Sequence, residues 1–226
     1  VYRLNVRGRQ HLPEEGGALL VANHVSFIDA LVVSASIDRP IRFIMHDEIY
    51  QTWWVRPIVH MLRAIPISAM GGPRELVQSM RTATQAIREG EIVCIFAEGQ
   101  ISRTGQMLPF RKGFERIMKD VEAPIIPVHL DRLWGSIWSF AEGRFFWKLP
   151  RRIPYRITIS FGRTLAHDAD TIAVRDAIME LGTEAWMARK LEQPLWHRAF
   201  IRTMRSHPFA IALADGRTPK MSYLMT

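Results

Sequence analysis

One histidine and one aspartate stand at a spacing that can make a general base. His24 and Asp29 follow an apolar run and are separated by four residues. On one continuous helix, at about 100° per residue, their side chains would lie roughly 140° apart. They meet if His24 precedes the helix and Asp29 lies in its first turn, where Asp29 would accept one imidazole N–H and leave the other nitrogen as a base. The alternative is a histidine that caps the helix and an aspartate that interacts with its dipole.

A second polar segment follows another apolar run. Residues 96–105 place a carboxylate (Glu98), a glycine (Gly99) and a cation (Arg103) in one turn. Arginine suits phosphate because its N–H groups form paired hydrogen bonds, and Arg111 and Lys112 lie just downstream. An ordinary solvated turn is the alternative.

Strands that end side by side must position these two segments. Apolar runs and 3.6-residue periodicity predict strands over 18–23, 42–46, 92–96, 124–130 and 155–161, and helices over 29–37, 50–63, 73–89, 110–119 and 170–190. This alternation predicts an α/β fold, a mostly parallel central sheet flanked by helices. Open sheets of this kind carry their sites in loops at the carboxyl ends of strands.

Length and composition limit the architecture. The chain has 226 residues, of which 48% are hydrophobic, and this excludes a disordered protein. We expect a domain over 1–190 followed by a C-terminal helix and tail over 191–226. The single cysteine, Cys94, excludes a disulfide framework and a cysteine-rich zinc site, and we expect no metal or cofactor. Cys94 lies in the middle of an apolar run, as a core thiol does.

The charge balance favours anionic partners. Thirty Lys and Arg against 22 Asp and Glu give a net charge of +8, which suits an anionic membrane, phosphorylated substrates or an acidic carrier protein. We find no zinc spacing, aromatic RNA-binding motif or recognition helix, so nucleic acid is not an expected partner. No uninterrupted apolar stretch reaches about 18 residues, the length of a usual membrane-spanning helix.

Together the motifs resemble those of the glycerolipid (lysophospholipid) acyltransferase family over about residues 5–190. His24 and Asp29 match its H-x4-D motif, and 123–128 match its proline-bearing strand. Phe96, Glu98 and Gly99 match its F-P-E-G motif, in which Ala97 replaces the proline. Residues 46–48, 97–105 and 109–113 resemble more narrowly the acyltransferase domain of bifunctional 2-acylglycerophosphoethanolamine acyltransferase/acyl-ACP synthetases. This resemblance implies a fused adenylate-forming domain in a longer parent protein, and both ends of the chain look cut.

Two departures from the family pattern concern phosphate binding. Ile101 stands where F-P-E-G-T-R members carry arginine, and 65–69 contain no basic residue. A bare phosphomonoester acceptor is therefore less favoured than a phosphodiester, unless Arg63, Arg103, Arg111 or Lys112 substitutes.

The resemblance implies direct acyl transfer by a lysophospholipid O-acyltransferase. His24 would deprotonate the free hydroxyl of a lysophospholipid, expected to be lysophosphatidylethanolamine, for attack on acyl-ACP or acyl-CoA. Acceptor-binding residues would be Glu98, Gly99, Ser102, Arg103, Arg111 and Lys112. Ser26 could be a nucleophile beside His24, although a helix cap or orienting hydrogen bond is preferred. A thioester or lipid hydrolase and a non-catalytic membrane module remain competing interpretations.

Aromatic and basic residues cluster in three segments. Residues 144–156 hold five cations, four aromatic residues and no acid, just after the aromatic stretch 133–140. A similar group lies within 50–63, and 196–205 form a basic amphipathic helix. We expect peripheral contact with the cytoplasmic face of the inner membrane. The alternatives are core aromatics beneath loops and, for the last helix, docking on a neighbouring domain.

Overall fold

The computed structural model describes residues 2–47, 56–68, 72–136, 138–140, 155–192, 196–213 and 221–222. The chain divides into two compact units, Val1–Ala185 and Trp186–Thr226. Most of the aromatic and basic segment 144–156, and Tyr50, Trp53 and Trp54 of the second cluster, lie outside the described residues.

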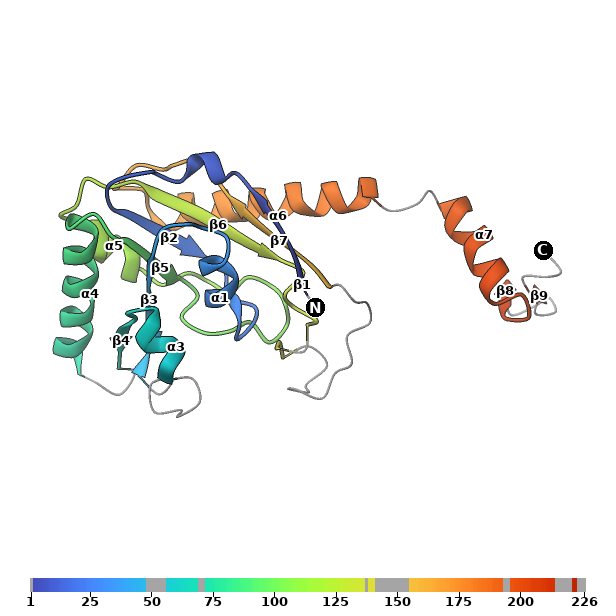
Figure 1. Cartoon of the computed structure of the whole chain (residues 1–226), viewed down its shortest axis with the longest axis horizontal. Helices are drawn as coiled ribbons and strands as arrows, with labels where there is room; N and C mark the ends of the chain where they lie inside the picture. Colours follow the sequence, from blue (N-terminus) through green and yellow to red (C-terminus); the bar gives the residue numbers. More distant parts are fainter. Residues whose placement is uncertain are drawn as a thin grey trace. The chain divides into compact units, whose positions relative to one another are not determined.

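A seven-stranded sheet in the order β1-β7-β6-β2-β5-β3-β4 forms the first unit (Figure 1). Its strands are β1 (Tyr2–Arg7), β2 (Ala18–Ala22), β3 (Ile41–His46), β4 (Ile65–Ile67), β5 (Ile92–Phe96), β6 (Ile125–Asp131) and β7 (Tyr155–Phe161). The five strands from β6 to β4 pair in parallel, whereas β7 pairs antiparallel with β6 and parallel with β1. The predicted α/β class with a mostly parallel sheet is confirmed.

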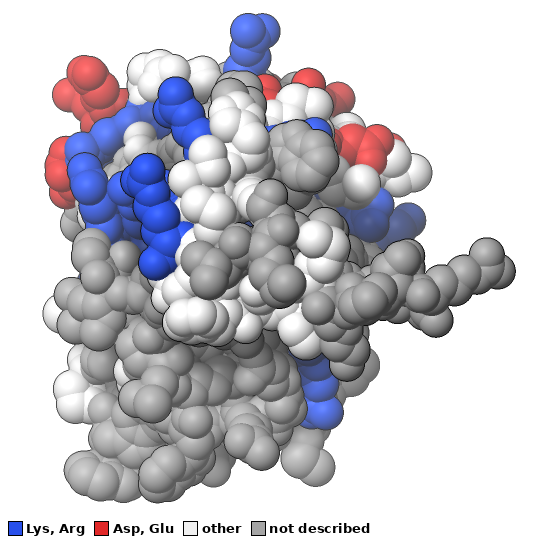
Figure 2. Space-filling model, turned by 90° about the vertical axis from the view of Figure 1, so that its right-hand side faces the viewer, with Lys and Arg blue, Asp and Glu red and all other residues white. Residues whose placement is uncertain are grey.

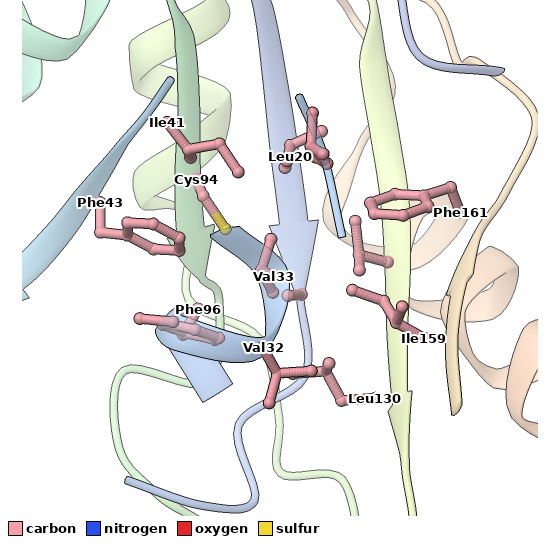
Figure 3. Packing of buried hydrophobic residues seen from close by; sticks show 14 of the residues in the cluster. Leu20, Val32, Val33, Ile41, Phe43, Cys94, Phe96, Leu130, Ile159 and Phe161 are labelled. Carbon is pink, nitrogen blue, oxygen red and sulfur yellow. The ribbon is translucent and has the colours of Figure 1, made fainter. Parts of the chain in front are cut away.

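Hydrophobic cores on both faces explain why the strands are continuous apolar runs. Every residue of the central strand β2 is fully buried, and its side chains alternate between the two cores. Leu20 packs in a core with Val32 and Val33 of α1 (Asp29–Ser34), as Figure 3 shows. Leu19 packs in the opposite core, which is covered by α4 (Pro73–Arg88), α5 (Gly113–Met118) and the start of α6 (Thr171–Glu192).

The helices follow the sequence patterns with shifted boundaries. Helix α4 begins at Pro73, buries Met80 and Ala83, and ends before Gly90, whose φ of 87° is left-handed. Asp170 caps α6 as expected, because its Oδ1 accepts the Ala173 N–H at 2.8 Å. Of the predicted helix over 50–63, the described part contains α3 (Arg56–Met61).

Two helix boundaries and one strand depart most from the prediction. Helix α5 begins at residue 113 instead of 110, because the Arg111 N–H bonds to the Ala97 carbonyl, which holds the chain beside the β5 loop. Helix α1 ends at Ser34 instead of 37. The short strand β4, only a weak motif in the sequence, adds an edge to the sheet beside β3.

The second unit contains the end of α6, helix α7 (Trp196–Ser206) and a two-stranded antiparallel pair, β8 (Ile211–Leu213) and β9 (Met221–Ser222). Helix α7 exposes Phe200 and Ile201 as well as the arginines Arg198, Arg202 and Arg205. Within the described part of the chain, no helix is both long and apolar enough to span a bilayer.

Candidate active site

The predicted site residues gather where three neighbouring strands end. His24 follows β2, Glu98 follows β5, and Asn23 joins the end of β2 to β6. The Asn23 Nδ2 donates to the Leu130 carbonyl at 3.2 Å, and its Oδ1 accepts the Leu130 N–H at 2.7 Å. This buried amide clamp fixes the backbone from which His24 projects.

His24 and Asp29 form a buried hydrogen-bonded pair. His24 lies in the turn before α1 and Asp29 is the first residue of that helix, and their Nδ1 and Oδ2 atoms are 2.9 Å apart. The Oδ2 also accepts the N–H groups of Val25 and Ser26, at 2.7 and 2.9 Å. Because a carboxylate only accepts hydrogen bonds, Nδ1 carries the proton and Nε2 keeps its lone pair. Asp29 is fully buried, whereas the His24 side chain is 18% exposed.

Phe96 orients the imidazole of His24 by stacking on one face of the ring, a role that the sequence motifs did not reveal. The rings of His24 and Phe96 stack with centroids 4.1 Å apart and planes at 15°. Phe96 in turn stacks on Phe43, at 6.2 Å. The pairing of Ala22 with Phe96 in adjacent parallel strands places this ring beside the residues that follow β2, so the register, once known, predicts the contact.

Glu98 holds backbone groups of the site. Its Oε1 accepts the His24 N–H and its Oε2 accepts the Leu108 N–H, both at 2.8 Å. The side chain is buried, and this burial raises the pKa of the carboxyl although the two hydrogen bonds act in the opposite direction. Glu98 was predicted to bind the acceptor; the structure engages both oxygens inside the protein, where they fix the position of His24.

Ser102 holds the opposite side of the same peptide. Its N–H donates to the His24 carbonyl at 2.8 Å, and its buried hydroxyl donates to the Gln106 carbonyl at 2.6 Å. Ser102 thus has a structural contact with His24, and its predicted contact with the acceptor stays a prediction. The loops after β2 and β5 are locked together through His24 itself.

Gly99 and Arg111 lie against each other, and all three predicted cations are exposed. Gly99 has a φ of 70°, which favours glycine, and a Cβ there would lie 2.8 Å from the Arg111 Nε, so a larger residue would displace this arginine side chain. The Arg103 guanidinium lies 5.5 Å from the centre of the Phe140 ring. Lys112 is exposed immediately before α5.

Arg63 cannot replace the missing phosphate ligands. Its Nη1 is 2.7 Å from the Glu91 Oε1, and Glu91 directly precedes β5. Glu98 lies two residues after the end of the same five-residue strand, which is roughly 17 Å long at the usual rise per residue. Arg63 therefore lies near the amino-terminal ends of the strands, whereas His24 lies near their carboxyl ends.

Neither Cys94 nor Ser26 has the surroundings of a nucleophile. Cys94 is fully buried in the core beneath α1 (Figure 3), and burial together with the negative charge of Asp29 raises the pKa of its thiol. The buried Ser26 hydroxyl donates to the Trp138 carbonyl at 3.1 Å and accepts the Ile28 N–H at 3.4 Å. Both groups have the structural roles that the sequence favoured.

Comparisons with known proteins agree with this architecture. The family described as Acyltransferase matches residues 3–131 of the chain. A chloroplastic 1-acyl-sn-glycerol-3-phosphate acyltransferase of Brassica napus is 27% identical over 130 residues, which cover 57% of this chain and 37% of that protein. The 1-acyl-sn-glycerol-3-phosphate acyltransferase of Bacillus subtilis is 26% identical over 126 residues, which cover 55% of this chain and 60% of that one. The chain thus spans less than two thirds of either relative.

A solved structure shares the fold. The crystal structure of the 1-acyl-sn-glycerophosphate acyltransferase of Thermotoga maritima superimposes with a TM-score of 0.64, covering 86% of this chain and 74% of that one at 19% sequence identity. The Acyltransferase match itself includes β2, β5 and the loops that carry His24, Asp29 and Glu98. With more than half of its residues matched, and with a histidine–aspartate pair at the carboxyl edge of the sheet, the chain belongs to the Acyltransferase family.

Proposed function

We propose that the chain is a lysophospholipid O-acyltransferase that uses His24 as its general base. The observation that carries this proposal is the 2.9 Å contact between His24 Nδ1 and Asp29 Oδ2, which leaves Nε2 as the basic atom of a partly exposed ring. The names of the relatives, which are acyltransferases acting on 1-acyl-sn-glycerol-3-phosphate, support a lysophospholipid as the acceptor.

The proposed reaction is a direct transfer. His24 Nε2 takes the proton from a free glycerol hydroxyl as its oxygen attacks the carbonyl carbon of an acyl thioester. The tetrahedral oxyanion collapses, the carbon–sulfur bond breaks, and the proton passes from His24 to the departing thiolate. The products are a diacyl phospholipid and a free thiol. The buried Asp29 carboxylate stabilises the imidazolium between the two proton transfers.

We propose lysophosphatidylethanolamine as the acceptor, the substrate of the 2-acylglycerophosphoethanolamine subtype. Its phosphodiester carries less charge than the phosphomonoester on which the relatives act. The chain has Ile101 where an arginine is expected, and Arg63 is engaged by Glu91 at the far edge of the sheet. Arg103 and Arg111 remain as exposed cations in the loops after β5, and this smaller set suits the less charged headgroup.

The proposal also includes an anionic acyl donor and contact with a membrane surface. Acyl-ACP and acyl-CoA are both anionic, and a net charge of +8 attracts either one. Lys and Arg side chains gather on part of the face drawn in Figure 2. We place the protein peripherally on an anionic membrane surface, at the cytoplasmic face of the inner membrane, where the lysophospholipid acceptor resides.

Product analysis tests this function. The purified chain is incubated in mixed micelles with lysophosphatidylethanolamine or lysophosphatidate, each with acyl-ACP or acyl-CoA, and lipids are quantified by mass spectrometry. We expect diacyl phosphatidylethanolamine to form faster than phosphatidate. Faster formation of phosphatidate would overturn the proposed acceptor, and release of free fatty acid without diacyl lipid would show a hydrolase instead.

A further inference from the structure

A third segment after β6, described over residues 133–136 and 138–140, contacts both loops of the site. The Trp138 carbonyl accepts hydrogen bonds from the Ser26 hydroxyl and the Phe27 N–H, both at 3.1 Å. The Trp134 indole covers Gly105, where a Cβ would lie 2.6 Å from the indole Cδ2. Membrane contact was predicted for these aromatic residues, with packing beneath loops as the alternative, and the described ones lie against the loops after β2 and β5.

Phe140 joins these loops through its ring. Its centroid lies 5.3 Å from that of Phe27, with the rings tilted by 59°, and the Arg103 Cζ lies 5.5 Å from the same centroid. A guanidinium over an aromatic face is attracted by the ring quadrupole. Next to Arg103, the Ser102 N–H bonds to the His24 carbonyl at 2.8 Å. Arg103 is thus held at its backbone beside His24 and at its guanidinium by Phe140.

The charge of Arg103 is available to a ligand. The ion pairs among the described residues do not include it, and the two carboxylates nearest in the site, Asp29 and Glu98, bond to His24 and to backbone N–H groups. Arg103 lies two positions after Ile101, the residue that stands in place of the family's arginine. An exposed arginine normally loses rotamer freedom when it binds, and the Phe140 ring restricts that freedom in advance.

We infer that Phe140, supported by Phe27, is a positioning residue that holds Arg103 to bind the phosphate of the lysophospholipid acceptor. The inference rests on the proposed function and adds a subsite to it. Restraint of a ligand-binding group before the ligand arrives lowers the cost of binding. Loss of this restraint should raise the KM of the acceptor. It should leave kcat, which depends on His24, nearly unchanged.

A double-mutant cycle tests the inference. Steady-state kinetics with lysophosphatidylethanolamine are compared for the wild type, Phe140→Leu, Arg103→Gln and the double variant, with melting temperatures to verify folding. We expect Phe140→Leu to raise the acceptor KM about two- to fivefold, the range of an exposed cation–π contact. In the Arg103→Gln background the same change should have no further effect. Phe140→Tyr keeps the aromatic face and should keep the wild-type KM, as should the matched control Phe209→Leu in the second unit.

Two results would overturn the inference while leaving the proposed function intact. One is an equal effect of Phe140→Leu in both backgrounds, which would mean that Phe140 acts only through packing. The other is an unchanged acceptor KM in Arg103→Gln, which would remove the arginine from the phosphate subsite. Failure of the wild type to acylate any lysophospholipid would instead overturn the proposed function and this inference with it.

Discussion

At the scale of single residues, the site depends on a few buried polar contacts around one imidazole. Asp29 Oδ2 accepts hydrogen bonds from the imidazole of His24 and from two backbone N–H groups, so the carboxylate, the turn and the ring hold one another in place. Phe96 stacks on one face of the ring. The ring therefore has a fixed plane and a fixed tautomer before any substrate binds, as general-base catalysis requires.

Cys94 provides a residue-scale prediction. Because its thiol is fully buried and its pKa is raised, iodoacetamide should alkylate the native protein about 10³-fold or more slowly than the unfolded chain, as reaction through rare unfolding requires. Thiol labelling followed by mass spectrometry measures both rates. Cys94→Ala should keep kcat within about threefold and lose roughly 0.5–3 kcal/mol of stability. Rapid native labelling that abolishes acyl transfer would contradict the assignment of Cys94 to the core.

At the scale of elements, the loop after β5 supports the loop after β2. Glu98 and Ser102 grip the N–H and the carbonyl of His24, each at 2.8 Å, although their backbones belong to a different strand's loop. The parallel order of β2 and β5 brings the two motifs to one edge of the sheet. Positioning of His24, the proposed general base, is therefore a property of two elements together.

Replacement of Glu98 by glutamine tests this support. The amide can accept one backbone N–H but meets the other with its own NH₂ group, so we expect a loss of roughly 1–3 kcal/mol in the free energy of unfolding and a lower kcat. Glu98→Asp is the matched variant, because it keeps the carboxylate on a side chain that is shorter by one methylene group. Full activity and stability in Glu98→Gln would contradict the role of Glu98 in holding the N–H groups of His24 and Leu108.

The difference in folding stability between the wild type and Glu98→Gln should change with pH in a definite direction. Burial raises the pKa of Glu98 in the folded protein, so the folded state binds its proton more tightly than the unfolded state does. The stabilising contribution is complete below the unfolded pKa and is lost as the pH rises through the folded pKa. Chemical denaturation across this range should therefore show wild-type stability falling relative to Glu98→Gln as the pH rises. A difference that stays constant would contradict the raised pKa.

Much of this arrangement could be predicted from the sequence, and the remainder depends on tertiary contacts. Continuous apolar runs identified β2 and β5, and the spacing of His24 and Asp29 allowed the contact that the structure shows, although the spacing alone left a capping histidine as the alternative. The inward orientation of Glu98 could not be predicted, because a motif does not show whether a carboxylate faces substrate or backbone N–H groups. Trp138 contacts Ser26 and Phe140 contacts Phe27, in each case more than a hundred positions away in the sequence. No local sequence pattern predicts such contacts.

At the scale of the whole molecule, helix α7 is the described element whose composition best suits the proposed contact with a lipid surface. Helix α7 exposes three arginines together with Phe200 and Ile201 and contains no acidic residue. A helix of this composition suits the headgroup region of an anionic bilayer, where each cation contributes about 1 kcal/mol.

Removal of these charges gives a prediction for the intact chain. The triple change Arg198→Gln, Arg202→Gln and Arg205→Gln should weaken binding to vesicles of phosphatidylethanolamine and phosphatidylglycerol by at least about tenfold, because up to about 3 kcal/mol of attraction is lost. Co-sedimentation at low salt measures the partition coefficient. The matched control removes three exposed cations of the first unit, Arg74, Arg81 and Arg116. Equal losses in both triple variants would contradict a specific role for α7.

The most direct test of the account is the turnover number of His24→Ala in diacyl phospholipid formation. The general base should contribute about 10²–10⁴-fold, so we predict that kcat falls by that factor while the melting temperature and acceptor KM change little. The control His60→Ala, at an exposed position of α3, should keep wild-type turnover. A folded His24→Ala protein with turnover within a few-fold of the wild type would contradict the central claim that His24, held by Asp29, is the catalytic base.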